Sequence, residues 1–203
     1  MILVMGLSQV TPTLRGALYL WDSNTATFGI QDGSGTWTNL GTSWWNPLTS
    51  SNVAITSADV ASFGAGGTGG TITLDGSRSL LGLVFGQTST TGYTLSGGSA
   101  MTLTLGANGI SVGPGAQPVT IGDANLSLVL GAAQMWTNRS TGVLTVGGAI
   151  DNGGNALTLA AVPGVSTTGL FTLGGALSGG GGLTAIRGAN ATLTAANGYT
   201  GAT

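Results

Sequence analysis

Six aspartates are the residues of this 203-residue chain most able to do chemistry, since lysine, glutamate, histidine and cysteine are all absent. Without histidine or cysteine there is no Ser-His or Cys-His nucleophile pair and no imidazole or thiolate zinc site. Two carboxylates held together could hydrolyse a glycosidic bond, and several could bind calcium. The six aspartates are Asp22, Asp32, Asp59, Asp75, Asp123 and Asp151, and most of them instead lie beside glycine or asparagine, as turn residues do. We therefore predict no catalytic residue, no metal site and no cofactor, and hence a protein that is not an enzyme.

Two glycine motifs resemble known binding and catalytic sequences. Residues 64–69 match G-x-G-x-x-G, but the dinucleotide motif requires a following helix, and the next residues, TITL, are typical of a strand. Residues 109–113 match G-x-S-x-G, but a nucleophile elbow needs a histidine base, which the chain lacks. We interpret the first motif as a flexible corner and the second as a strand between glycines.

The composition favours a folded chain made almost wholly of β-structure. Glycine accounts for 39 residues and charged residues for 5%, while 41% are hydrophobic and the formal net charge is −2. This apolar content argues against disorder and against a flexible linker. The four arginines are too few for a phosphate-binding stripe, so nucleic acid is not an expected partner. No uninterrupted apolar run reaches about 18 residues, so no transmembrane helix is predicted.

Short alternating strands separated by glycine-rich turns recur from about residue 70 onward. Examples are TITLDG at 71–76, MTLTLG at 101–106 and LSLVLG at 126–131, and GISVG at 109–113 is a further separate strand. Even spacing of this kind is typical of a repeat architecture. Strands this short, with connections of unequal length, favour a parallel β-helix over a sandwich or a propeller. At about 22 residues per turn, roughly the last 150 residues would make about seven turns.

Four of the five tryptophans precede these repeats. We predict that they form a cap on the solenoid, because aromatic residues bury large areas. The alternative is an aromatic platform that stacks on carbohydrate, with Trp37, Trp44 and Trp45 as the contact residues. The predicted organisation is an apolar N-terminal strand or extension over 1–17, a Trp-rich capping region over 18–69 and β-solenoid repeats over 70–203.

The last third of the chain resembles the autotransporter-associated β-strand repeat. LSGGGGLT at 177–184, ATLT at 191–194 and NGYTGAT at 197–203 carry the likeness. It departs from the family where AIR at 185–187 replaces the usual Lys-x-Gly and where Ala191 replaces glycine. The Trp-rich start is similar to the leading segment of the same long bacterial surface proteins. The resemblance implies a secreted, right-handed parallel β-helix of the passenger-stalk type at the bacterial cell surface.

Threonines that alternate with apolar residues form T-x-T pairs in three of the predicted strands: Thr71 and Thr73, Thr102 and Thr104, Thr192 and Thr194. Flat ranks of threonine order water in ice-binding solenoids. Threonine is also favoured at solvent-facing strand positions in general. The sequence leaves both interpretations open.

The two ends of the solenoid lead to the functional prediction. An uncapped end exposes strand edges that can pair with another chain. We predict head-to-tail stacking of copies into a surface fibre, in which an apolar N-terminal strand contacts the neighbouring copy through Met1, Ile2, Leu3, Val4, Met5 and Leu7. The alternative for these residues is the remnant of a secretion signal.

The prediction is thus an extracellular structural protein that forms a homo-oligomer. One alternative is an adhesin or passenger-stalk fragment that binds glycans or surfaces through the aromatic start. The other is a β-helix enzyme that acts on polysaccharide.

Overall fold

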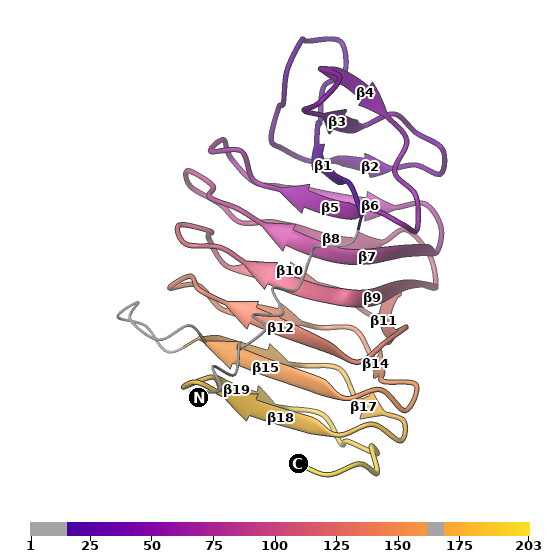
Figure 1. The fold of residues 1–203 in the computed structure, drawn as a ribbon, viewed down its shortest axis with the longest axis vertical. Coiled ribbons are helices and arrows are strands. Elements are labelled where there is room, and N and C mark those ends of the chain that lie inside the picture. The colour runs from indigo at the N-terminus through magenta and orange to yellow at the C-terminus, as the bar shows by residue number, and fades with distance from the viewer. Residues whose placement is uncertain (1–15, 162–168) are drawn as a thin grey trace, which may run out of the picture.

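The computed structural model describes residues 16–161 and 169–203, which contain strands and no helix. The strands form a 12-stranded and a 7-stranded sheet. Both sheets wind around one axis, with the N-terminal strands at one end of a rod and the C-terminal strands at the other (Figure 1). The predicted fold class, an all-β parallel solenoid with a Trp-rich N-terminal region, is confirmed.

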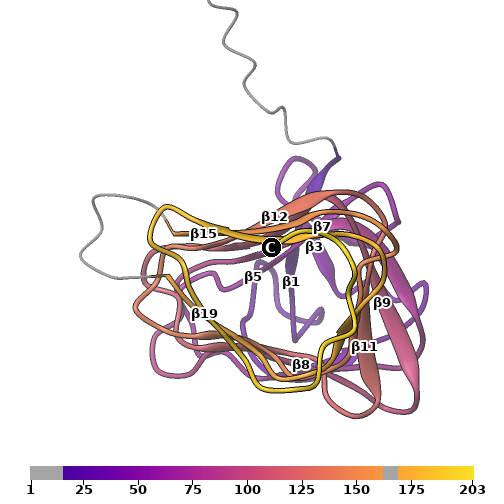
Figure 2. The ribbon, with the colours of Figure 1, turned by 90° about the horizontal axis from the view of Figure 1, so that it is seen from below.

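The 12-stranded sheet bends to cover two sides of the solenoid, and the 7-stranded sheet forms the third side (Figure 2). The first face contains the starts of β7 (Arg78–Phe85) and β9 (Met101–Val112), then β11 (Leu126–Leu130), β14 (Ile150–Asp151) and β17 (Leu177–Ser178). The second face contains β1 (Leu18–Trp21), β5 (Val60–Phe63), the ends of β7 and β9, β12 (Gln134–Asn138), β15 (Leu157–Ala161) and β18 (Leu183–Ile186). The third face contains β2 (Gly35–Trp37), β6 (Thr71–Leu74), β8 (Thr94–Gly97), β10 (Val119–Ile121), β13 (Leu144–Val146), β16 (Leu170–Leu173) and β19 (Asn190–Leu193).

Alternation of apolar and polar residues builds the core. In β11 the three leucines are buried and the residues between them are partly exposed. Inward side chains of neighbouring coils stack in columns, because each strand pairs in parallel with the one above it. One such column on the third face runs through Leu95, Ile121, Val146 and Leu173.

The length of each turn varies along the rod. Paired residues on the third face are 23, 26, 25, 27 and 20 positions apart, from Thr71 through Thr94, Thr120, Thr145 and Thr172 to Thr192. Five turns therefore separate β6 from β19, and the expectation of about seven turns is wrong. Four of the five turns are longer than the roughly 22 residues on which that expectation is based. The two strands expected at 101–106 and 109–113 are also one strand, β9, which continues from the first face to the second.

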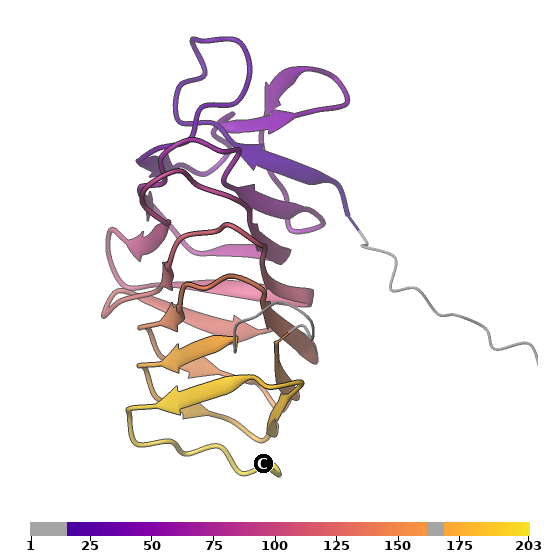
Figure 3. The ribbon, with the colours of Figure 1, turned by 90° about the vertical axis from the view of Figure 1, so that its left-hand side faces the viewer.

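An antiparallel hairpin closes the N-terminal end of the rod (Figure 3). Its strands are β3 (Trp44–Asn46) and β4 (Ser51–Val53), and β3 also pairs antiparallel with β1. Beneath the hairpin, the ring of Trp44 packs edge to face on Trp21, Trp37 and Phe63, with centroid distances of 5.4, 4.8 and 5.4 Å. The three tryptophans are at most 1% exposed. This aromatic cluster ends the column of aliphatic side chains.

The C-terminal end of the rod has no comparable cover within the described ranges (Figure 1). β19 is the last strand of the third face, and its apolar residues Ala191 and Leu193 remain partly exposed. The chain then begins a further coil, in which Gly198 and Thr200 donate backbone hydrogen bonds to carbonyls of Leu177 and Gly179. The two ends of the solenoid therefore differ: one is closed by aromatic residues, and the other leaves apolar residues half-covered.

Candidate functional site

The aspartates are dispersed and serve the turns of the chain. Asp22 is buried under the cap, where its carboxylate accepts hydrogen bonds from the backbone N–H groups of Asn24 and Gln31 and from the Asn52 amide. Carboxylates that accept backbone N–H groups of their own turns are those of Asp59, Asp123 and Asp151. In the part of the chain that the structure describes, no group of three Asp, Glu, His or Cys residues could hold a metal ion.

The G-x-G-x-x-G segment binds a carboxylate of the protein itself. It forms the loop between β5 and β6, and its backbone N–H groups at Ala65 and Gly67 donate hydrogen bonds of 2.8 and 2.7 Å to Oδ2 of Asp32. A methyl group at Gly67 would press against the Asp32 side chain. Successive N–H groups in a glycine-rich turn make a concave anion site. The motif therefore forms an anion site that is occupied by a carboxylate of the same chain. The interpretation of this loop as a flexible corner does not include its hydrogen bonds to Asp32.

Tyr93 completes this contact. Its hydroxyl donates a 2.7 Å hydrogen bond to Oδ1 of Asp32 and accepts one of 3.1 Å from the backbone N–H of Gly33. Burial of the Tyr93 side chain, followed by its hydrogen bond to the Asp32 carboxylate, raises the pKa of Tyr93 above its usual value. The loop between β1 and β2 is thus tied to two coils below it.

The G-x-S-x-G segment belongs to the second face. Residues up to Val112 are part of β9, and Ser111 pairs with Val84 of β7 on one side and with Thr137 of β12 on the other. The Ser111 hydroxyl accepts a 3.3 Å hydrogen bond from that of Thr137. Ser111 thus has the surroundings of an ordinary outward-facing strand residue.

The tryptophans suggested as glycan contacts are buried. Trp37 is 1% exposed, Trp44 is fully buried and Trp45 is 8% exposed. The ring of Trp45 is further covered by Phe28, which packs edge to face on it at 5.1 Å. Stacking on a sugar requires a free ring face, so the alternative of an aromatic platform at these three residues is wrong for this structure. Their burial is what a cap requires.

Exposed apolar residues gather instead on the outside of the cap. Phe28, Leu40 and Leu48 are 82, 83 and 91% exposed, and they lie in the loops that join β1 to β2, β2 to β3 and β3 to β4. Leu40 also has a φ of 59°, in the left-handed region that a leucine seldom occupies. Residues held in this region cluster at functional sites in proteins. The sequence analysis missed these residues because isolated apolar residues in loops carry no periodic signal.

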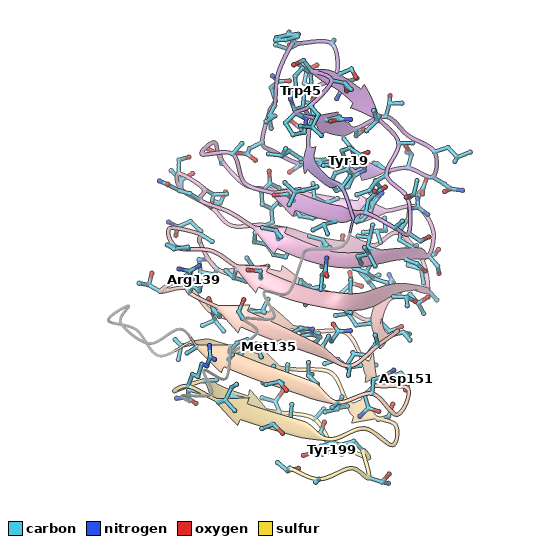
Figure 4. All side chains as sticks on the ribbon, in the orientation of Figure 1. Tyr19, Trp45, Met135, Arg139, Asp151 and Tyr199 are labelled. Carbon is cyan, nitrogen blue, oxygen red and sulfur yellow. The ribbon has the colours of Figure 1, made fainter. Side chains whose placement is uncertain are left out.

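The opposite end of the rod also carries apolar side chains that are only partly buried. They pack on the core from the last coil and are Ala189, Ala191, Leu193 and Tyr199. Figure 4 shows Trp45 in the cap and Tyr199 at the other end of the rod, with Met135 on its side. The other exposed large apolar residues in the described ranges are Leu18 at the start of β1 and Met135 in β12, 39 and 40% exposed.

A groove of about 540 Å³ follows the corner between the third and first faces. It crosses several coils and is lined largely by small side chains, among them Ala100, Ala124, Ala149 and Ala176. The carboxylate at its edge, Asp123, is already engaged by the N–H groups of Asn125 and Leu126. The groove therefore offers small side chains and a carboxylate that is already hydrogen-bonded, which does not favour catalysis.

The N-terminal assembly residues Met1, Ile2, Leu3, Val4, Met5 and Leu7 lie outside the described residues. Among the residues that the structure places, no helix is long and apolar enough to cross a membrane. Comparison of the chain with protein-family models, with curated proteins and with solved structures returned no match.

Proposed function

We propose that the chain is an extracellular structural protein, a β-solenoid subunit that associates end to end into a fibre at the bacterial cell surface. One observation carries the proposal: apolar side chains are left uncovered chiefly at the two ends of the rod. Phe28, Leu40 and Leu48 stand out from the cap, and Leu193 and Tyr199 are half-covered in the last coil. Burying such surface favours association by roughly 25 cal/mol per Å² of apolar area.

The contact that we propose joins the cap of one copy to the last coil of the next. Such a contact uses two different surfaces and does not close on itself, so it extends into a filament. The antiparallel hairpin of β3 and β4 covers the N-terminal end. The proposed joint is therefore made chiefly by side-chain packing, because a continuous parallel sheet across all three faces would require the space that this hairpin occupies.

The low charge of the chain supports close stacking. Only 5% of the residues are charged, and the formal net charge is −2. Little electrostatic repulsion therefore opposes contact between copies. The proposed location outside the cell depends on the resemblance of residues 177–203 to the autotransporter-associated repeat.

Light scattering of the purified chain as a function of concentration tests the proposal. We expect the mean mass to rise with concentration, and we expect the variant Leu40→Ser/Leu48→Ser to remain a monomer. The matched control is Met135→Ser, which removes an exposed apolar side chain from the side of the rod and should associate like the original chain. Equal association of all three proteins would refute a joint at the cap.

The segment Met1–Leu7 is proposed as a second contact between copies. Deletion of residues 1–10 tests this part alone. Loss of association on deletion, with the cap intact, would assign the joint to the N-terminal strand. Unchanged association would leave the cap and the last coil as the contact and would exclude the N-terminal strand.

A further inference from the structure

A ladder of threonines runs along the third face from β6 to β19, through six of its seven strands. Each member pairs with the next in the register of the sheet, through five successive strand pairs. The six residues come from β6, β8, β10, β13, β16 and β19: Thr71, Thr94, Thr120, Thr145, Thr172 and Thr192. The six threonines are unequally spaced in the sequence, because the turns differ in length, but the structure places them in one row.

The hydroxyl groups of the ladder are free. All six side chains are partly or fully exposed, and the neighbours of Thr120, Thr145 and Thr172 in their strands are buried, whereas those of Thr192 are partly buried. Among the described residues, none of these six hydroxyls makes a side-chain hydrogen bond, although other threonines do, such as Thr91 to the Gly69 carbonyl and Thr137 to Ser111. Each rung therefore offers a methyl group and an uncommitted hydroxyl.

The third face is also regular and uncharged. Its seven strands contain no aspartate and no arginine. The register between its strands shows no shift, in contrast to the pairing of β7 with β9, which shifts between Leu80 and Gly82. Two positions after each ladder threonine stands a further small residue: Thr73 and Ser96 within their strands, and Gly147, Gly174 and Thr194 directly after theirs, whereas Gly122, directly after β10, is buried. The face is therefore a rigid array of small groups.

This array does not suit a protein, a glycan or an anion. Binding sites for proteins depend on tryptophan, tyrosine and arginine anchors, and the outward positions of the third face carry none of these. It offers no outward aromatic ring for stacking on a sugar and no positive charge for a phosphate. What it does offer is a lattice of hydroxyl and methyl groups.

We propose that the third face binds ice. Strands in a sheet lie about 4.7–4.9 Å apart, so the ladder repeats at that interval along the rod. This interval is close to the spacing of oxygen rows in hexagonal ice. The hydroxyls can take the place of water molecules in such rows, while the methyl groups fill the spaces between them. The array is preorganised by the sheet, so little conformational entropy is lost on binding. The pair Thr102 and Thr104 lies on the first face and is not part of the array.

The test is inhibition of ice recrystallisation and shaping of single ice crystals by the purified chain. We expect the original protein to inhibit recrystallisation and to produce faceted crystals. We expect Thr145→Tyr, in the middle of the ladder, to lose most of this activity, because its ring would lift the ice surface away from the neighbouring rungs. The matched control, Thr158→Tyr, changes a partly exposed threonine in β15 on the second face and should keep full activity.

Thr145→Val supplies a milder variant if the tyrosine disturbs folding, since it keeps the shape and the methyl groups and removes only the hydroxyl. Circular dichroism establishes that each variant is folded. Ice crystals that grow as in buffer alone, or equal loss of activity in Thr145→Tyr and Thr158→Tyr, would overturn the proposal. A change in sedimentation on Thr145→Tyr without any effect on ice would show that the face packs against other copies instead.

Discussion

The hydroxyl of Tyr93 donates a 2.7 Å hydrogen bond to Oδ1 of Asp32, across 61 positions of sequence. The other oxygen of the same carboxylate is held by the N–H groups of Ala65 and Gly67. Three segments from different coils therefore meet at one carboxylate next to the cap. This contact fixes the loop that presents Phe28 at the end of the rod.

Removal of the Tyr93 hydroxyl should weaken the protein most at neutral pH. Tyr93→Phe leaves the Gly33 N–H and one Asp32 oxygen without their partner, which costs about 1–3 kcal/mol of unfolding free energy. Urea denaturation at pH 8 measures this loss. The same change at Tyr19, whose hydroxyl makes no side-chain hydrogen bond among the described residues, is the control and should have a much smaller effect.

The raised pKa of Tyr93 also predicts a dependence of stability on alkaline pH. The unfolded chain ionises this tyrosine near its ordinary pKa of about 10, whereas the folded chain keeps it protonated to higher pH. Above that value the unfolded state binds fewer protons than the folded state, so stability falls as pH rises. Urea midpoints between pH 9 and 11 should fall more steeply for the original chain than for Tyr93→Phe. Parallel curves would contradict the burial of this hydroxyl.

The aromatic cluster should account for much of the stability of the cap. Trp44→Ala removes a fully buried ring that contacts Trp21, Trp37 and Phe63, and we expect it to cost about 3–5 kcal/mol. Trp44→Phe should cost less, since the indole N–H of Trp44 has no hydrogen-bond partner among the described residues. Thermal unfolding followed by tryptophan fluorescence measures both. A loss for Trp44→Ala of the size expected at an exposed residue would contradict a packed cap.

The coils are closely stacked, so a glycine that faces the backbone of a neighbouring coil should not tolerate a side chain, whereas a glycine in open space should. A methyl group at Gly92 would overlap the carbonyl oxygen of Pro118 in the next coil, whereas one at Gly198 meets no atom within 4 Å. We expect Gly92→Ala to destabilise the fold by at least about 1–3 kcal/mol and Gly198→Ala to stay within about 0.5 kcal/mol of the original chain. Chemical denaturation of the two variants decides between this packing and a looser one.

Much of the fold follows from the sequence alone. The alternation of apolar residues with threonine in segments such as 71–76 and 101–106 predicts strands with one buried side, and the glycine-rich segments between strands predict the turns. The position of the cap follows from the clustering of tryptophan. These features are local, so a single sequence is enough to reveal them.

The arrangement of the three faces could not be predicted in the same way. Turns of 20 to 27 residues place Thr94 beside Thr71 and Thr192 beside Thr172 in neighbouring coils, but no sequence pattern states how many residues each corner contains. The contact between Asp32 and the loop at Ala65 was missed for a similar reason. Its signal, a glycine-rich loop with the form of an anion site, is present in the sequence, but its partner comes from another coil.

Crosslinking gives an independent test of how copies meet. The chain contains no cysteine, so the variant Leu48→Cys/Thr194→Cys carries one thiol in the cap and one in the residue after β19. A short bismaleimide should convert it to a ladder of covalent multimers. Either single variant should stay largely monomeric, because in head-to-tail order the equivalent thiols of neighbouring copies lie one rod length apart. A double variant that stops at dimers would show that like ends meet, and the head-to-tail order would then be wrong.

Electron microscopy of the negatively stained, purified chain tests the central claim most directly. Association through the two ends predicts filaments one solenoid wide, whose axial repeat equals the length of one copy and whose number rises with protein concentration. Isolated rods at every concentration, or pairs that never grow longer, would contradict the account.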